Sequence, residues 1–231
     1  MKKISVAIPC YEYGDLGSEV TEWCFRSLQI QKFKDFEVVI SDNSKDKRIK
    51  ELCERWSDIL DIKYFYNPTR GAAINSNNAI LKSDCDIIKF LCADDYLYDA
   101  NSLKTIYENF DENTNWAFTS YVHTRDRIEC YRYFVPSPIS NPFVNLLGTP
   151  SAMTIRNFGL LPALELFDTS LSYGYDIEAY YRWTKVLGNP KIINQIGIVN
   201  YVWDNSVSSS VTADLIDHEN KYILKKYGVS K

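Results

Sequence analysis

The 231-residue chain has little of what several classes of protein require. It has only two histidines, His123 and His218, and its six cysteines form no CxxC pair, so we expect no zinc site. No segment approaches the roughly 18 uncharged apolar residues of a membrane span, so we expect no transmembrane segment. Pro9 interrupts the first apolar run too early for a secretory signal. These absences predict a cytoplasmic protein, which a partner could bring to a membrane surface.

An excess of basic residues is also missing. The chain has 26 Lys and Arg against 30 Asp and Glu, for a net charge of -4, which argues against a nucleic-acid partner. Hydrophobic residues make up 45% of the sequence, an ordinary share for a globular domain. The length suits one domain over residues 1–231. Apart from Cys92, we expect the cysteines to be reduced thiols used as small buried apolar groups.

Short apolar segments alternate with longer amphipathic segments through the first 100 residues. This pattern predicts strands over 4–9, 36–41, 62–67 and 86–91, and helices over 20–31, from about 46, and after 70. Strands separated by helices form parallel sheets with right-handed crossovers. We therefore predict an α/β fold with a Rossmann-like, mostly parallel sheet flanked by helices.

The second half of the chain is less regular. Its patterns predict strands over 115–124, 127–135 and near 151–156, an extended segment over 191–203, and helices over 175–188 and 214–228. Glycines at the ends of the two helices, Gly188 and Gly228, favour helix termination there.

Polar residues follow each of the four strands predicted in the first half. They are Tyr11 and Glu12, Asp42 and Asn43, Asn67 and Arg70, and Asp94 and Asp95. In such sheets, ligands bind beyond the carboxyl ends of the strands, so we expect these residues along one rim.

The adjacent carboxylates of Asp94 and Asp95 oppose each other's ionisation unless a cation neutralises them. Oxygen ligands favour Mg²⁺ or Mn²⁺, and Mg²⁺ usually completes its shell with water and substrate phosphates. The pair therefore indicates a diphosphate substrate. The alternative is that both residues only turn the chain or cap the next helix.

Two further rim residues have the same two interpretations. Arg70 could contact a phosphate oxygen or form a surface salt bridge. Asp42 could accept hydrogen bonds from the N–H groups of a nucleobase, or serve only in a turn.

Three segments carry a family resemblance when taken together and in order. They read ISVAIPCYE over 4–12, SLQIQKFKDFEVVISDNSKD over 27–46, and NPTRGAAINSNNAILKSDCDIIKFLCADDYL over 67–97. This series resembles the inverting, nucleotide-diphospho-sugar-dependent glycosyltransferases of family 2, which have the A-type (GT-A) fold. The resemblance implies a nucleotide-sugar-binding half over 1–100 and a mixed, acceptor-binding half over 101–231.

The resemblance also implies a reaction. A sugar would move from a nucleotide-diphosphate sugar, such as a UDP-sugar, to a hydroxyl of a sugar, a lipid-linked glycan or another acceptor, in the synthesis of a glycan or surface polysaccharide. A lipid-linked acceptor, like a partner, could bring the cytoplasmic protein to a membrane surface.

Site residues follow from the same resemblance. It implies that Pro9, Tyr11 and Asp42 hold the nucleobase, and that Arg70 lies near the nucleotide phosphates. Asn67 precedes Arg70 on the same rim and completes the predicted donor site.

The DxD motif of the family aligns with Cys92, Ala93 and Asp94, so a cysteine replaces the first aspartate. A neutral thiol is a poor ligand for a hard cation. We therefore predict that Asp94 binds Mn²⁺ or Mg²⁺, and that Asp95 supports the metal or the ribose.

The general base in this family is an acidic residue at the start of a helix, which the resemblance assigns to Asp176. Glu178 lies two residues further on and points to another face of the same helix, so both cannot serve equally. We expect flexible lids in the loops around 125–127 and 204–212.

Two other functions compete with this interpretation. A degenerate nucleotide-sugar-binding protein without turnover would explain Cys92. A sugar-phosphate nucleotidyltransferase is less favoured, because the loop after the first strand lacks the basic, glycine-rich sequence that such enzymes use.

Overall fold

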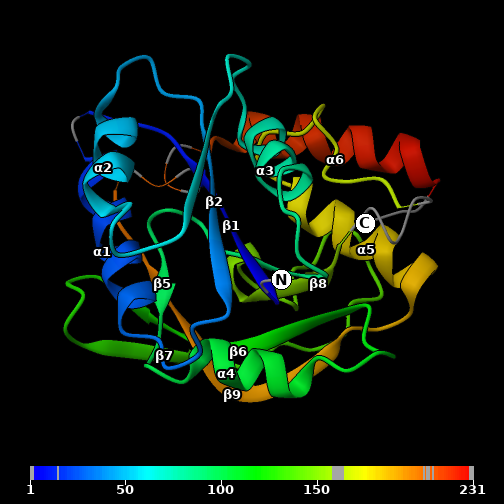
Figure 1. Cartoon of the computed structure of the whole chain (residues 1–231). Helices are drawn as coiled ribbons and strands as arrows, with labels where there is room; N and C mark the ends of the chain where they lie inside the picture. The colour runs from blue at the N-terminus through cyan, green and yellow to red at the C-terminus, as the bar shows by residue number, and fades with distance from the viewer. Residues whose placement is uncertain are drawn as a thin grey trace.

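A single mixed β-sheet runs through the computed structural model, which describes residues 3–14, 16–157, 164–204, 206, 209 and 211–228. Within this part of the chain the strand order is β3-β2-β1-β4-β8-β6-β9-β5, and β7 pairs with β6 (Figure 1). The strands are β1 (Ile4–Cys10), β2 (Phe36–Asp42), β3 (Ile62–Tyr66), β4 (Ile87–Phe90), β5 (Tyr96–Leu97), β6 (Trp116–Thr124), β7 (Cys130–Phe134), β8 (Met153–Arg156) and β9 (Lys191–Tyr201).

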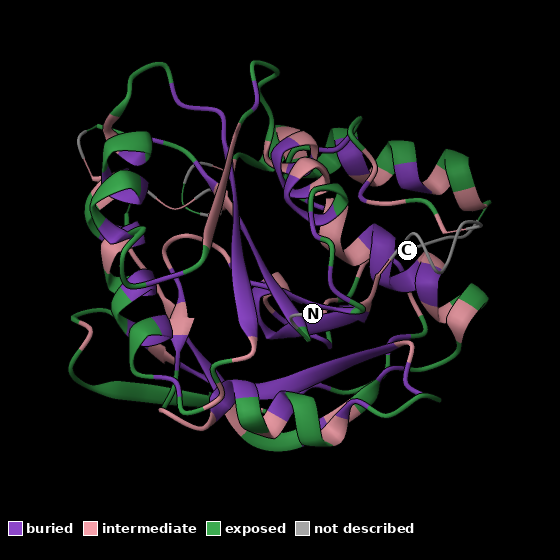
Figure 2. Ribbon diagram, in the orientation of Figure 1, coloured by how far each residue is buried: buried purple, intermediate pink, exposed green. Residues whose placement is uncertain are grey.

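The first four strands form the parallel part of the sheet. Strand β1 pairs in parallel with β2 and β4, and β2 pairs in parallel with β3. Strands β1, β2 and β4 are buried almost throughout, as Figure 2 shows, because helices cover both faces. The Rossmann-like parallel sheet that the alternating pattern predicted is therefore confirmed.

The second half adds a mixed extension. Strand β8 lies antiparallel between β4 and β6, whereas β9 runs parallel to β6. Strands β7 and β5 pair antiparallel with β6 and β9 at the margins. Both the predicted α/β class and the mixed second half are confirmed.

Helices flank the sheet on two sides. Helices α1 (Gly17–Gln29) and α2 (Arg48–Trp56) lie on one side, and α3 (Ala72–Leu81), α5 (Tyr175–Leu187) and α6 (Ala213–Tyr227) lie on the other (Figure 1). Helix α4 (Ser102–Asn109) packs on β9, and a short 3-10 turn, η1 (Pro150–Ala152), precedes β8. No helix in the described part of the chain is long and apolar enough to cross a bilayer.

Helix α1 begins three residues earlier than its apolar periodicity predicts. The carboxylate of Glu12 accepts the N–H groups of Gly17 and Ser18 at 2.7 and 2.8 Å. This anion satisfies two of the four unpaired amides at the helix start and interacts favourably with the helix dipole. Position 17 also requires glycine, because a Cβ there would lie 2.3 Å from the carbonyl oxygen of Tyr11.

Candidate functional site

A cavity of about 470 Å³ opens beyond the carboxyl ends of β1 and β4. This is where ligands bind in open α/β sheets, and the volume suits a small organic molecule. Four of the predicted site residues line it, namely Pro9, Tyr11, Arg70 and Asp94. Asn43, Asn75, Ser76, Cys92, Tyr175, Trp203 and Asp204 also contribute to the lining.

Tyr11 and Arg70 form one wall of the cavity. The Arg70 guanidinium carbon lies 5.6 Å from the centre of the Tyr11 ring, in cation–π contact. Arg70 is exposed and makes no ion pair with any described residue, so the surface salt bridge considered for it is not present there. Its charge is available to an anionic ligand.

Asp42 and Asn67 support this rim from behind and do not line the cavity. One carboxylate oxygen of the buried Asp42 accepts the backbone N–H and hydroxyl of Ser44, and the other accepts the Tyr64 hydroxyl at 2.7 Å. The backbone N–H of Asn67 donates to the Asp42 carbonyl at 2.7 Å. The Asn67 side-chain N–H donates to the Asn75 oxygen at 3.3 Å, so both side chains already have protein partners. Contact of Asp42 with a nucleobase, and of Asn67 with the donor, stays a prediction.

The sequence reasoning missed Asn75, which joins these elements together. Its side-chain N–H donates to the carbonyl oxygens of Cys10 and Ser41, each at 2.9 Å. Its oxygen accepts the Ser41 hydroxyl at 2.6 Å and the Asn67 amide at 3.3 Å. The ends of β1 and β2 are thus fixed by one buried residue of α3, for which the polar segment NSNN was the available signal.

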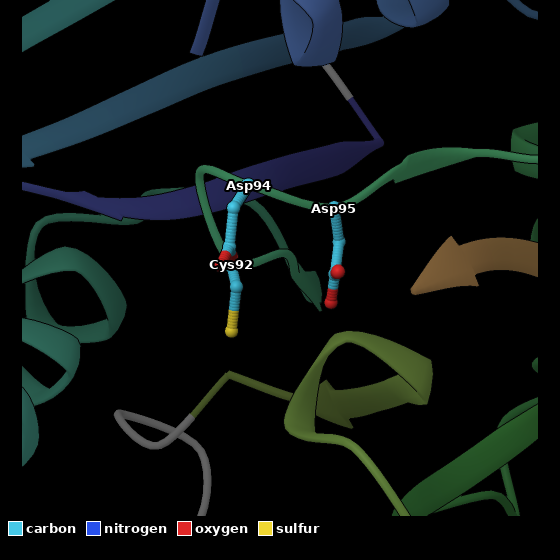
Figure 3. A group of neighbouring side chains, drawn as sticks. All are labelled: Cys92, Asp94 and Asp95. Carbon is cyan, nitrogen blue, oxygen red and sulfur yellow. The ribbon is translucent and has the colours of Figure 1, made fainter. Parts of the chain in front are cut away.

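Asp94 and Asp95 lie in the turn after β4, with Cys92 beside them (Figure 3). Ligand atoms of the three residues all lie within 4.8 Å of one another. Asp94 reaches the cavity, where one of its oxygens accepts the indole N–H of Trp203 at 2.9 Å. Asp95 is 1% exposed and accepts the side-chain N–H of Asn200 and the backbone N–H of Tyr201, both at 2.9 Å. The two adjacent carboxylates therefore have different surroundings.

Burial dominates the electrostatics of this turn. It raises the pKa of Asp94, and burial together with the charge of Asp94 raises the pKa of Asp95 to about 7. Burial also raises the pKa of the Cys92 thiol, which is therefore neutral at physiological pH. Of the three groups Asp94 is the better placed for a hard cation, because one oxygen of Asp95 already has two donors and a neutral thiol binds such ions poorly; binding of a metal by Asp94 stays a prediction.

A buried lysine lies behind this turn, and no sequence signal marked it. Lys89 of β4 is fully buried, and its ammonium donates to the carbonyl oxygens of Ser151 and, at 3.3 Å, Met153. Burial lowers the pKa of Lys89 to about 7, against the opposing charge of Asp95. The hydroxyl of Ser151 accepts the N–H of Cys92 at 2.9 Å, which connects the lysine to the turn.

Asp176 and Glu178, the two candidate bases, occupy different environments in the first turn of α5. Asp176 is half-buried and accepts the N–H of Ile177 at 2.8 Å. Burial raises the pKa of Asp176 to about 7, and the charge of Glu219 adds to this effect. Glu178 is fully buried and is bound by Arg182, Lys226 and Tyr227, so it has a structural role.

The loop around residues 125–127, predicted to be a lid, is held in place. The Arg127 guanidinium carbon lies 4.2 Å from the Tyr201 ring centre and 5.4 Å from the Trp23 ring centre. The same side chain pairs with Glu19 at 3.2 Å and is only 14% exposed. In the second predicted lid, residues 205, 207, 208 and 210 lie outside the described part of the chain.

Solved structures with a similar fold bind nucleotides. The chain aligns over 99% of its length with 68% of S. aureus TarS 1-349 in complex with UDP-GlcNAc, at a TM-score of 0.69 and 18% identity. It aligns over 89% of its length with 58% of the mannosyltransferase PcManGT from Pyrobaculum calidifontis in complex with GDP-Man and Mn²⁺, at a TM-score of 0.62 and 16% identity. At these identities the likeness shows the GT-A fold.

Relatives by sequence are glycosyltransferases too. One is the GalNAc(5)-diNAcBac-PP-undecaprenol beta-1,3-glucosyltransferase of Campylobacter jejuni, 30% identical over 48% of this chain and 36% of the relative. Another is an uncharacterized glycosyltransferase of Rickettsia conorii, 34% identical over 52% of this chain and 19% of the relative. The alignments thus cover only about a third or less of each of these longer relatives.

The family model for glycosyl transferase family 2 matches residues 5–150, which include the parallel half of the sheet and the acidic turn after β4. Because this match covers more than half of the chain, the protein belongs to glycosyl transferase family 2.

Proposed function

We propose that the protein is an inverting glycosyltransferase that moves a sugar from a nucleoside-diphosphate sugar, with UDP-sugars favoured, to an acceptor hydroxyl. The observation that carries this proposal is the cavity that Tyr11, Arg70 and Asp94 line together. Tyr175, the first residue of α5, also lines it, whereas the neighbouring Asp176 does not. One cavity thus offers an aromatic wall, a cation for phosphates and a carboxylate for a metal. The UDP-GlcNAc complex of TarS, whose fold is similar, supports the donor class.

The donor would lie along the rim from β1 to β4. Tyr11 and Pro9 would contact the nucleobase and Arg70 the diphosphate, because these residues line the cavity and Arg70 is exposed and unpaired among the described residues. Asp42 and Asn67 would act mainly by fixing the rim, since their side chains are already bound by Ser44, Tyr64 and Asn75.

The residues present fit a divalent cation held by one protein carboxylate. Asp94 would hold Mn²⁺ or Mg²⁺, since Mg²⁺ commonly uses one or two carboxylates and takes its other ligands from phosphates and water. Such a cation would help to neutralise the charge that grows on the departing diphosphate. Arg70 provides the same stabilisation from the chain itself.

Asp176 would be the general base. A carboxylate with a pKa of about 7 is partly ionised at neutral pH and accepts a proton more readily than an ordinary aspartate does. As the acceptor oxygen bonds to the anomeric carbon, its proton passes to Asp176 and the bond from that carbon to the diphosphate oxygen breaks. A single displacement of this kind inverts the configuration at the anomeric carbon.

The acceptor is proposed to be a hydroxyl of a growing glycan. The name of the C. jejuni relative describes transfer to an undecaprenol-linked glycan, which supports this class and includes lipid-linked acceptors. A lipid-linked acceptor would bring the protein to a membrane surface without a membrane-spanning helix in its described part.

Thermal denaturation with UDP, UDP-GlcNAc, UDP-glucose and GDP-mannose, each with and without Mn²⁺, tests the donor site. A ligand at a hundred times its Kd stabilises a protein by about 2.7 kcal/mol, or roughly 5–10 °C at this size. We expect Asp94→Asn to lose the Mn²⁺-dependent part of the rise. Asp84→Asn, an exposed aspartate at the opposite end of β4, is the control that should keep it.

Absence of any rise with every nucleotide would contradict the proposal. Transfer and hydrolysis both release UDP or GDP, which can be measured. Binding of the donors with no such release would instead favour the degenerate binding protein.

A further inference from the structure

We propose that Glu219 of α6 is a positioning residue for Asp176, which fixes the first turn of α5 and sets the charge around the proposed base. The inference rests on the proposed role of Asp176 and extends it to a helix that contributes nothing to the lining of the cavity. It begins from an unusual feature, a carboxylate that is almost fully buried at the start of another helix.

Glu219 is 4% exposed and has no cation beside it among the described ion pairs. Its carboxylate instead accepts three consecutive backbone N–H groups, those of Ser172 at 2.6 Å, Tyr173 at 3.2 Å and Gly174 at 2.8 Å. A buried carboxylate needs such partners, and these three amides lie immediately before the first residue of α5. The carboxylate of Glu219 and these three amides therefore satisfy each other's hydrogen-bonding groups.

Helix α5 lacks a cap of its own. Its N-cap residue is Gly174, which has no side chain to accept an N–H group, whereas helices usually begin with Ser, Thr, Asp or Asn. The acidic group at this helix start is instead supplied by Glu219, 45 residues later in the sequence, whose carboxylate accepts the N–H of Gly174 at 2.8 Å.

Helix α6 holds α5 at a second place. Lys226 and Tyr227 of α6 both bind the carboxylate of Glu178, the lysine at 3.0 Å. Asp176 lies in the sequence between Gly174, which Glu219 holds, and Glu178. Two contacts from one helix therefore restrict how this turn of α5 can move or rotate.

The charge of Glu219 acts on Asp176 in the same place. The titratable groups near enough to interact with Asp176 are Cys92 in the turn after β4, Tyr121 on β6, Tyr175 and Tyr180 on α5, and Glu219 on α6. At neutral pH the thiol and the tyrosines, whose pKa values are all raised, carry no charge, so Glu219 is the anion of this group. The negative charge of Glu219 disfavours ionisation of Asp176, so the Asp176 carboxylate is a stronger base.

The test replaces Glu219 by glutamine, which keeps the shape and removes the charge. The side-chain carboxyl carbon of Asp176 is followed by ¹³C NMR from pH 4 to 9 without metal, and its resonance is assigned by its loss in Asp176→Asn. We expect the titration midpoint of Asp176 to fall by about 0.5 pH unit in Glu219→Gln, since burial is the main cause of its raised pKa and the charge of Glu219 is a smaller one. Asp217→Asn on the same helix, whose side chain is 65% exposed, is the matched control and should leave the midpoint unchanged.

A midpoint that stays within about 0.2 pH unit of the wild-type value in Glu219→Gln would overturn the proposal, because the charge of Glu219 would then have no resolvable effect on Asp176. If Glu219→Gln does not fold, hydrogen exchange of the wild-type protein decides. We expect the amides of Ser172, Tyr173 and Gly174 to exchange at least about 100-fold more slowly than exposed amides, and exchange at the exposed rate would overturn the proposal.

Turnover provides the separate check on the proposed function. Where the wild-type protein hydrolyses UDP-GlcNAc, the acidic limb of its kcat profile should shift with the NMR midpoint in Glu219→Gln. A midpoint that shifts as expected while no donor is ever turned over would sustain the coupling of Glu219 to Asp176 and count against catalysis.

Discussion

Replacement of Glu178 by glutamine should separate the structural acid of α5 from the proposed base. Glu178 is fully buried and accepts two hydrogen bonds from Arg182, each at 3.0 Å, one from Lys226 at 3.0 Å and one from the hydroxyl of Tyr227. Glutamine keeps the shape of the side chain but removes its negative charge, so that Arg182 loses its carboxylate and Lys226 keeps only its ion pair with Asp168.

The magnitude follows from how far these partners are buried. Breaking a buried ion pair by removing one charge costs about 3–5 kcal/mol. Arg182 and Lys226 are 15% and 26% exposed, so water can partly solvate the cations that remain. We therefore expect a loss near the lower limit, about 3 kcal/mol, which corresponds to a fall in Tm of about 6–12 °C for a chain of this length.

Urea unfolding followed by circular dichroism at pH 7 measures this loss. Glu22→Gln is the matched control, because Glu22 and Arg26 form the same Glu–Arg pair four residues apart on α1, but with side chains 34% and 58% exposed. This control should lose less than about 1 kcal/mol. A loss below about 1 kcal/mol in Glu178→Gln, at an unchanged dependence on urea, would refute the structural role.

The dependence on pH gives a second check of the same variant. Burial alone would raise the pKa of Glu178, but hydrogen bonds from Arg182 and Tyr227 outweigh it and lower the pKa below the usual 4.5. A carboxylate with a lowered pKa contributes stability that is complete above its unfolded value and is lost as the pH falls through its folded value. The difference between wild type and Glu178→Gln should therefore narrow below about pH 4.5.

Three other substitutions test the site. Asp176→Asn should lower turnover at least about 100-fold while the Kd for UDP, measured by calorimetry, changes less than about twofold, and unchanged turnover would exclude Asp176 as the base. Asn75→Ala should cost about 2–4 kcal/mol in urea unfolding, because it leaves the carbonyls of Cys10 and Ser41 without their buried donor, and a loss under about 0.5 kcal/mol would contradict this. Gly17→Ala should weaken UDP binding about tenfold or more, because its Cβ would collide with the carbonyl of Tyr11 at 2.3 Å and displace that cavity wall; unchanged affinity would show that the wall can adjust.

The rim of the cavity could be predicted because topology alone places it. Strands and helices of the first half have clear periodicity, and the carboxyl ends of parallel strands share one edge. Tyr11, Arg70 and Asp94 accordingly line one cavity. The boundaries were less predictable: α1 starts early because Glu12 caps it, and β5 has only two residues, which pair with Val199 and Ile198.

The supports of the site could not be predicted, because their partners lie far away in sequence. Asp95 is bound by Asn200 and Tyr201, more than 100 residues later, and Glu219 binds amides 45–47 residues earlier. Asp176 and Glu178 lie on the same helical turn and differ in how far their side chains are buried. That difference depends on which elements pack against the turn. Only the packing of α6 on α5 reveals which acid is bound by cations.

The cysteine in the acidic motif changes the charge balance at the end of β4. Burial and the charge of Asp94 already raise the pKa of Asp95 to about 7, and a third carboxylate at position 92 would oppose ionisation further, whereas the buried Cys92 thiol is neutral. Lys89, which burial leaves only partly charged at neutral pH, lies close enough to interact with Asp95, so the turn attracts a cation less than two free carboxylates would. The missing negative charge can come from the diphosphate of the donor. Metal and nucleotide should therefore bind as a pair, and Mn²⁺ alone should raise the Tm less than Mn²⁺ together with UDP.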